Sequence, residues 1–436
     1  MRGLTDQLRV QVVSKKGLIS GAFIYLFANI FNAAIPFLIL PVLTRYLAPS
    51  EYGQVAMFQT LIAALSAFVG LNAMSAATRK FYDDIEDDEL RKFIGACLQI
   101  LFVSAFLVFC VLYVLGPFLA PSLGISPFWI LMAVLVAAGN FLMQLRLGQW
   151  QVRKKPLHFG ALQVSMSLMN AVISLYLVVV LAMGPEGRMS GQLVAPLFIG
   201  LVGLVLLHRD GLISLEFNKF YIKEALAYGV PLIPHVGGMF LLMAVDRFFV
   251  NKYLGLEAAG IYMVAVQLAM AMGICFDAFN KAYVPWLFER LKENDSTQKS
   301  LIVKGTYCYF ILALCMAFLA FLLGPYAVVF LAGERYSEAG SVLGLLAIGQ
   351  AFQGMYLMVT NYIFFSKRTG WLSLVTTLSG FFNIAIMLLI IPFLGLYGAA
   401  SAFAISMCVR FFITWFVAHK SHPMPWMNIF FPKSKC

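Results

Sequence analysis

Long apolar stretches separated by short polar segments recur along the whole chain of 436 residues. Several of them continue for roughly 18 residues or more with few charges, the length that an α-helix needs to cross a bilayer. A transmembrane β-barrel would instead show strands of about ten residues in which apolar and polar side chains alternate. The pattern therefore predicts an all-α integral membrane protein.

The apolar pattern predicts twelve transmembrane helices. Their expected ranges are 17–43, 52–75, 92–118, 127–150, 158–183, 190–208, 228–251, 257–281, 301–324, 338–364, 370–393 and 397–418. Pro36 and Pro41 interrupt the first of these ranges, Pro231 and Pro234 interrupt the seventh, and Pro285 lies just after the eighth. Broken helices are typical of transporter cavities, although kinks that only improve helix packing are an open alternative.

The composition agrees with a membrane protein, since 61% of the residues are hydrophobic and only 12% are charged. The formal net charge of +11 would suggest nucleic-acid binding in a soluble protein. Most of the 31 Lys and Arg residues, however, fall in loops on the side of the N-terminus, whereas the other side holds only Arg45, Arg188, Arg247, Lys252 and Arg335. By the positive-inside rule we expect both termini in the cytoplasm and no nucleic-acid partner.

Short motifs recur between the two halves of the chain at a nearly constant spacing. Leu115-Gly116-Pro117 returns as Leu323-Gly324-Pro325, and Tyr46-Leu47 with Gly53 returns as Tyr253-Leu254 with Gly260. We therefore expect two six-helix lobes related by a parallel repeat, with a functional site between them. The expected division is an N-terminal lobe over 1–210, a cytoplasmic linker over 211–225 and a C-terminal lobe over 226–436.

Ionisable side chains inside the predicted helices are the candidate functional residues. A charge at the centre of a bilayer costs about 2.5–3.5 kcal/mol on insertion scales unless it faces protein, water or a ligand. The candidates for binding an anionic substrate are the deep Arg146 and Arg410, followed by Arg247, Lys281 and Arg45 nearer the helix ends. The candidates for gating or ion coupling are Asp246, Asp277 and His235.

Several of these candidates have a structural alternative. Lys281 and Arg247 lie close enough to helix ends for their charged groups to reach the membrane–water interface. Asp277 precedes Lys281 by four residues, the spacing of a structural ion pair along a helix. His235 has a second interpretation as a hydrogen-bonded packing residue. Adjacent helical residues point about 100° apart, so we expect Asp246 and its neighbour to need separate partners. Arg146 shows no local counter-charge in the sequence, which predicts a functional role for it.

An enzyme is not expected. No extramembrane segment contains His, Ser, Cys or carboxylate residues in a nucleophile or two-carboxylate arrangement. The seven Cys lack the paired spacing of a metal site or disulfide framework, and no cofactor is indicated. A basic interior suits an anionic headgroup, whose phosphate oxygens Arg binds with two parallel hydrogen bonds.

The segments Pro41 to Gly53, Pro231 to His235, Asp246 to Tyr262 and Pro285-Trp286 resemble those of a polysaccharide-exporting flippase branch. Its superfamily also contains the MATE exporters and lipid II flippases, and within the branch the chain is similar to Wzx O-antigen flippases. The resemblance covers nearly the whole length. Arg45 and Asp246-Arg247 match family positions, whereas Arg146, Lys281 and Arg410 are transferred by topology alone.

The resemblance implies a bacterial inner-membrane flippase with a cationic lumen. Such a protein moves undecaprenyl-pyrophosphate-linked oligosaccharide units from the cytoplasmic to the periplasmic leaflet by alternating access. Its partners would be the lipid-linked oligosaccharide and other polysaccharide-assembly proteins, namely a polymerase and a chain-length regulator.

Two other functions stay open. A MATE-like multidrug exporter commonly has an acid in the first helix, where this chain has only Asn29 and Asn32. A membrane glycan polymerase would need a large periplasmic catalytic loop, which the pattern does not predict. Lipid II flippases usually add two further helices beyond the twelve expected here.

Overall fold

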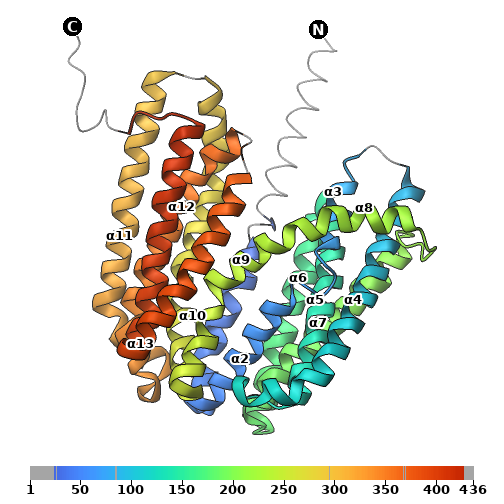
Figure 1. Cartoon of the computed structure of the whole chain (residues 1–436), viewed down its shortest axis with the longest axis horizontal. Coiled ribbons are helices and arrows are strands. Elements are labelled where there is room, and N and C mark those ends of the chain that lie inside the picture. Colours follow the sequence, from blue (N-terminus) through green and yellow to red (C-terminus); the bar gives the residue numbers. More distant parts are fainter. Residues whose placement is uncertain are drawn as a thin grey trace. The chain divides into compact units, whose positions relative to one another are not determined.

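The computed structural model describes residues 24–25, 27–83, 86–293, 295–366, 368 and 370–426. Within these ranges the chain forms helices and no strand (Figure 1). A helix over Phe27–Tyr46 comes first. It is followed by α2 (Pro49–Leu65), α3 (Ala73–Lys80), α4 (Asp87–Leu123), α5 (Pro127–Val152), α6 (Pro156–Leu175), η1 (Tyr176–Val180), α7 (Gly184–Arg209), α8 (Lys219–Gly229), η2 (Val230–Leu232), α9 (Ile233–Met243), α10 (Val245–Glu293), α11 (Ser296–Ala332), η3 (Glu334–Tyr336), α12 (Glu338–Phe365) and α13 (Gly370–Ser421).

Local sequence signals account for several helix starts. Proline occupies the first turn of α5 at Pro127 and of α6 at Pro156, where its missing N–H costs no hydrogen bond. Asn218 caps α8, because its side chain accepts a hydrogen bond from the N–H of Phe220 at 2.9 Å. Asp295 caps α11 through two amides of the first turn. These caps satisfy donors that no helical carbonyl can reach.

Ten helices of the described chain are long and apolar enough to cross a membrane. The 52 residues of α13 would span about 78 Å if straight, whereas the hydrocarbon core is roughly 30 Å thick. α13 bends at Gly395, with a positive φ of 56°, and so provides two spans. Together with the pair α2 and α3, the described residues supply the twelve expected spans. The predicted all-α membrane fold is confirmed.

The second predicted helix, over 52–75, is broken in the structure. α2 ends at Leu65, and the backbone then turns through Gly70, Leu71 and Asn72, which all have positive φ. Glycine adopts this conformation without strain, and the N–H of Gly70 donates to the hydroxyl of Ser104 in α4 at 2.8 Å. Contact with α4 therefore stabilises a break that the apolar pattern does not reveal.

The chain forms two compact units. Unit 1 consists of Met1–Ile39, Leu61–Pro121 and Ile125–Ile233, and unit 2 consists of Leu40–Thr60, Ser122–Gly124 and Pro234–Cys436. Neither unit is continuous in sequence, because most of α2 and the short segment Ser122–Gly124 belong to unit 2. The division into 1–210, 211–225 and 226–436 stays a prediction.

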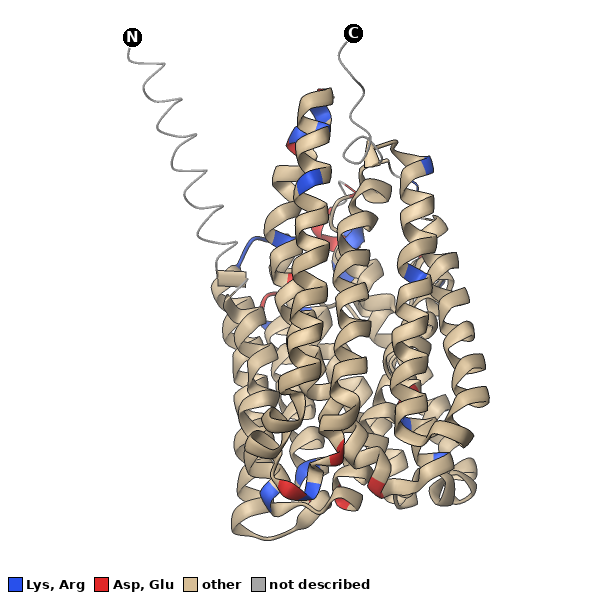
Figure 2. Ribbon diagram, turned by 90° about the vertical axis from the view of Figure 1, so that its left-hand side faces the viewer, with Lys and Arg blue, Asp and Glu red and all other residues tan. Residues whose placement is uncertain are grey.

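One end of unit 1 collects the loops that were assigned to the cytoplasm. Lys80 of α3 forms an ion pair with Glu224 of α8, which lies across this end (Figure 1). The guanidinium of Arg153, which follows α5, lies 5.0 Å from the centre of the Phe81 ring. Figure 2 shows most charged residues towards the ends of helices and long uncharged stretches between them.

Unit 2 contains a reciprocal contact between two glycines of the predicted repeat. A Cβ on Gly53 of α2 would lie 2.0 Å from the carbonyl oxygen of Leu256 in α10. A Cβ on Gly260 of α10 would lie 1.9 Å from the carbonyl oxygen of Pro49 in α2. The two backbones approach this closely because neither position carries a side chain. The recurrence of these glycines thus corresponds to a paired structural role.

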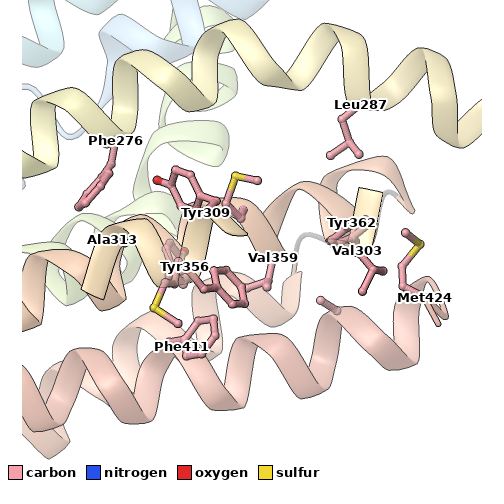
Figure 3. Close-up of a cluster of buried hydrophobic side chains, with 14 of the residues drawn as sticks. Phe276, Leu287, Val303, Tyr309, Ala313, Tyr356, Val359, Tyr362, Phe411 and Met424 are labelled. Atoms are coloured by element: carbon pink, nitrogen blue, oxygen red, sulfur yellow. The ribbon is translucent and has the colours of Figure 1, made fainter. Parts of the chain in front are cut away.

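The core of unit 2 is an apolar cluster from α10, α11, α12 and α13. Figure 3 shows Phe276 of α10 and Phe411 of α13 directed into it, with Tyr309 and Tyr356 between them. Inside a membrane such clusters are stabilised by van der Waals packing rather than by release of water. Tyr356 also borders the most unusual polar residue of unit 2, Arg410.

Candidate anion-binding site

Arg410 is a fully buried cation of unit 2. It lies in α13 beyond the bend at Gly395, and only 2% of its surface is exposed. Its guanidinium donates to the side-chain oxygen of Gln353 at 2.8 Å and to the hydroxyl of Thr376 at 3.4 Å. The central carbon of the guanidinium lies 3.7 Å from the centre of the Tyr356 ring. Helices α12 and α13 thus hold the group in one orientation.

The partners of Arg410 leave its charge uncompensated. Among the described residues Arg410 forms no ion pair, and its Nε has no hydrogen-bond partner. A buried ion costs several kcal/mol unless an opposite charge accompanies it, and an aromatic ring offsets only about 0.5–2 kcal/mol. An anion that reaches this guanidinium would supply the missing charge, and the Nε–H is available as an additional donor.

Helix α9 brings His235 to the same region. The sulfur of Met239 lies 3.9 Å from a terminal nitrogen of Arg410, and His235 precedes Met239 by one turn on the same face of α9. The Nδ1 atom of His235 is buried and has no partner in the described chain. The structure therefore brings together two of the predicted residues, Arg410 and His235, each with a nitrogen that lacks a partner.

Small residues allow α9 to approach α13 closely. A Cβ on Gly238 would lie 3.0 Å from the Cα of Thr377, and a Cβ on Gly380 would lie 2.9 Å from the Cβ of Leu241. The hydroxyl of Thr377 also donates to the carbonyl of Pro234 at 3.3 Å. The broken helix is thereby held against α13 at the level of His235.

Arg146 is the corresponding buried cation of unit 1, with 1% of its surface exposed. It forms an ion pair with Asp210, which directly follows α7, and its guanidinium lies 4.1 Å from the centre of the Trp150 ring. The hydrogen bond from Arg146 lowers the pKa of Asp210, against the raising effect of burial. Arg146 therefore has a counter-charge in the structure, although the sequence around it offers none. Asp210 is 64 residues away in sequence, so only the fold brings it close.

Asp246 and Arg247 contact each other, contrary to expectation, although each also has the separate partner that was expected, Tyr262 for Asp246 and the carbonyl of Met243 for Arg247. One carboxylate oxygen of Asp246 accepts from the backbone N–H of Arg247 at 2.9 Å and from its guanidinium at 3.2 Å. The other oxygen accepts from the hydroxyl of Tyr262 at 3.0 Å. Asp246 is the second residue of α10, so its carboxylate lies beside the amides of the first turn, which have no helical carbonyl as partner. Both charges are buried and compensated.

The remaining predicted residues lie at more open positions. Lys281 and Asp277 form an ion pair of 2.6 Å along α10, with about half of each side chain exposed. This geometry agrees with the structural alternative for the pair. Arg45 is exposed near the end of the helix over Phe27–Tyr46. The roles of all these residues stay predictions.

Several residues that contact the predicted site residues were not identified from the sequence. Gln353 and Tyr356 are three residues apart on one face of α12, and this spacing within an apolar range could have indicated a polar face. Asp210 and Tyr262 gave no such signal, since their importance depends on contacts between distant elements.

A family comparison agrees with the expected family. The polysaccharide biosynthesis protein family matches residues 18–291, and the chain belongs to this family. A protein of the Lsg locus of Haemophilus influenzae is 25% identical over 397 residues, covering 87% of this chain and 94% of the relative. The succinoglycan biosynthesis transport protein ExoT of Rhizobium meliloti is 25% identical over 352 residues, covering 77% of this chain and 66% of the relative.

Solved structures show the same fold. The lipid II flippase MurJ in an inward closed conformation has a TM-score of 0.73 at 14% identity, covering 91% of this chain and 87% of that chain. An inward-facing MATE family multidrug resistance transporter of the MOP superfamily has a TM-score of 0.72 at 14% identity, covering 90% of this chain and 94% of that chain. The chain is a multi-pass membrane protein with a MATE-like fold, within a family of polysaccharide biosynthesis.

Proposed function

We propose that the protein is a flippase for undecaprenyl-pyrophosphate-linked oligosaccharides in the bacterial inner membrane. It would carry the headgroup from the cytoplasmic to the periplasmic leaflet by alternating access. The observation that carries this proposal is the buried, uncompensated Arg410 in a chain of the polysaccharide biosynthesis family. A pyrophosphate provides the negative charge that the surroundings of Arg410 lack.

The neutral partners of Arg410 suit a carrier that must both bind and release an anion. Gln353 and Thr376 hold the guanidinium without neutralising it. The ring of Tyr356 supports the planar guanidinium of Arg410, which can bind two phosphate oxygens through parallel hydrogen bonds. His235 provides a second donor for the same group. A carboxylate partner would instead compete with the substrate for the guanidinium.

Transport of this kind leaves the covalent bonds of the substrate unchanged, and the protein is not proposed to be an enzyme. The prenyl tail stays in the bilayer while the polar head crosses. Both termini would lie in the cytoplasm, as the distribution of Lys and Arg predicts. A polymerase and a chain-length regulator that use the translocated units are the expected partners.

The proposal is tested by deleting the gene and measuring surface glycan together with undecaprenyl-linked units. We expect polymeric glycan to disappear and lipid-linked units to accumulate on the cytoplasmic face. The wild-type gene should restore export, whereas an Arg410→Met variant present at the same level in the membrane should not. Normal surface glycan together with altered dye efflux would contradict the proposal and favour a multidrug exporter.

The exporter alternative has less support from the contacts of the first helix. The described residues of that helix include no acid, and its amides are engaged within unit 1. Asn29 accepts a hydrogen bond from Gln163 at 3.1 Å, and Asn32 accepts one from Ser167. A cation site at this helix would need a carboxylate that the position does not offer.

A further inference from the structure

Unit 1 has an apolar groove that the proposed anion site does not use. The groove has a volume of about 720 Å³ and follows α4 where it faces α5 and α7. Leu98, Phe102, Phe106 and Phe109 line it from one face of α4. His208 is the one polar residue among its lining residues. Such a surface suits hydrocarbon and offers almost nothing to water.

A second groove of about 680 Å³ lies beside the first. The two share Leu98, Phe102 and Leu215, so they form one apolar tract along α4. We term this tract the α4 groove. Its second part is lined by Leu71, by the connection from α7 to α8 and by α8 itself.

The depth of the first part matches one leaflet of a bilayer. From Leu98 to Phe109, α4 rises about 16 Å, and a hydrocarbon core is roughly 30 Å thick. Its Leu98 end lies at the connection from α7 to α8, where Lys92 and Glu216 form an ion pair of 3.6 Å. The positive-inside rule assigns this end of unit 1 to the cytoplasm. The α4 groove therefore faces the cytoplasmic leaflet.

The segment that connects α7 to α8 packs against α4 and forms one wall of the α4 groove. A Cβ on Gly95 would lie 1.7 Å from the carbonyl oxygen of Ser214, so only glycine allows this approach. The side chain of Gln99 donates to the carbonyl of Leu215 at 2.9 Å, and the N–H of Ser214 donates to the carbonyl of Arg91 at 3.2 Å. Leu215 is held at the groove with 67% of its surface exposed.

Two cations lie near the same end. Arg91 precedes Leu98 by about two turns of α4, and Arg209 follows the lining residue His208. Both arginines are exposed, and neither forms an ion pair within the part of the chain that the structure describes. The first turn of α4 also carries Asp87, Asp88 and Glu89 at this end, so the two arginines are the groups here that could attract an anionic lipid head.

We propose that the α4 groove binds the prenyl chain of the lipid-linked substrate, with Arg91 and Arg209 at its pyrophosphate. This rests on the proposed function and names the surface that receives the substrate before translocation. A prenyl chain carries a methyl branch on every isoprene unit, and we assign it to the two adjoining grooves together. An unbranched acyl chain needs only one narrow groove.

Photolabelling tests the site on the full chain in vesicles of zwitterionic phospholipid. The probe is undecaprenyl pyrophosphate with a photoreactive group in its tail, and we expect labelled peptides from α4 and α5. Leu135→Trp or Ala138→Trp fills the groove and should lower labelling about tenfold, because several methylene groups lose their contacts. Val114→Trp, on an α4 residue that is 64% exposed and not part of the groove, is the matched control.

Competition distinguishes a prenyl site from a general lipid surface. Unlabelled undecaprenyl pyrophosphate should abolish labelling, whereas phosphatidylglycerol at the same concentration should not. Equal competition by both lipids, or labelling spread evenly over all exposed helices, would overturn the proposal. Arg91→Gln combined with Arg209→Gln should weaken binding severalfold, and unchanged binding would remove the arginines from the site.

Two further outcomes separate this inference from the proposed function. Arg410→Met should lose transport but retain labelling of the α4 groove. If that variant loses transport while both groove-filling variants are labelled like the wild type, the groove proposal fails alone. If gene deletion leaves surface glycan intact while labelling stays specific, the flippase proposal fails and the lipid site remains.

Discussion

Arg146 and Arg410 are the two largest fully buried side chains of the described chain, yet the two units compensate them differently. In unit 1, Arg146 lies over Trp150 and forms an ion pair with Asp210. In unit 2, Arg410 lies over Tyr356 and donates only to neutral groups. Both arginines therefore lie over an aromatic ring, and only Arg146 has a carboxylate partner among the described residues.

This difference shows that depth in the membrane does not by itself identify a substrate site. A buried arginine with a carboxylate has its charge compensated, although Nε and one terminal nitrogen of Arg146 lack hydrogen-bond partners among the described residues. A buried arginine among neutral donors and acceptors retains its attraction for an anion. We therefore propose Arg410 as the stronger candidate for binding phosphate. For Arg146 we propose a structural role in its ion pair with Asp210.

Replacing Arg410 should have the largest effect on transport. Arg410→Met removes the charge but keeps most of the volume, so we expect flipping in reconstituted vesicles to fall at least about a hundredfold. Thermal stability should be unchanged or higher, because an uncompensated buried charge is removed. Arg410→Lys should also transport poorly, since an ammonium group cannot donate two parallel hydrogen bonds to a phosphate as a guanidinium does.

The control for Arg410 is Arg335→Gln, at an exposed residue of η3. It removes one positive charge from unit 2 without touching the buried site, and transport should stay near the wild-type rate. Comparable losses in both variants would mean that net charge, and not the Arg410 site, determines the rate.

Tyr356 should have the next largest effect, because its ring orients the guanidinium. Tyr356→Leu removes a stacking interaction of about 0.5–2 kcal/mol and should lower transport roughly tenfold. Tyr356→Phe keeps the ring and should retain most of the activity. Measured flipping rates for the two variants separate the ring from the hydroxyl, and equal losses would show that the hydroxyl is the important group.

His235 should contribute less, because Arg410 already supplies a permanent charge. His235→Ala removes a donor near the proposed phosphate position and should lower transport about fivefold, the effect of one modest hydrogen bond. His235→Gln keeps a donor at a similar position and should recover part of that loss. If His235→Ala destabilises the protein while the rate per folded molecule is normal, the packing interpretation of His235 is correct.

Much of the fold was predictable because the bilayer imposes long apolar helices on any chain that crosses it. Gly53 and Gly260 recur in sequence and contact each other's helices, but the two six-helix lobes expected from this repeat stay a prediction. The break at Gly70 to Asn72 was not visible, because a hydrogen bond to distant Ser104 stabilises it.

The candidate site was predictable only in its charged members. Arg146 and Arg410 stand out equally in an apolar sequence, and nothing local distinguishes them. Their difference lies in Asp210 and in the neutral partners Gln353 and Thr376, which are brought close by packing between helices. Sequence periodicity identifies the residues of a helix face, but it does not identify what that face contacts.

Asp210→Asn should have the smallest effect on transport, within about twofold, while changing stability and its pH dependence. The side chain of Asp210 is 41% exposed, so we expect its ion pair to stabilise the protein by only about 1 kcal/mol. Arg146 lowers the pKa of Asp210 in the folded state, so this stabilisation is present above the ordinary carboxylate pKa of about 3.9 and is lost as pH falls through the lower folded value. Unfolding curves of wild type and variant should therefore differ at pH 7 and converge in strong acid. A transport defect as large as that of Arg410→Met would instead place the Arg146 pair in the transport mechanism and remove the distinction between the two arginines.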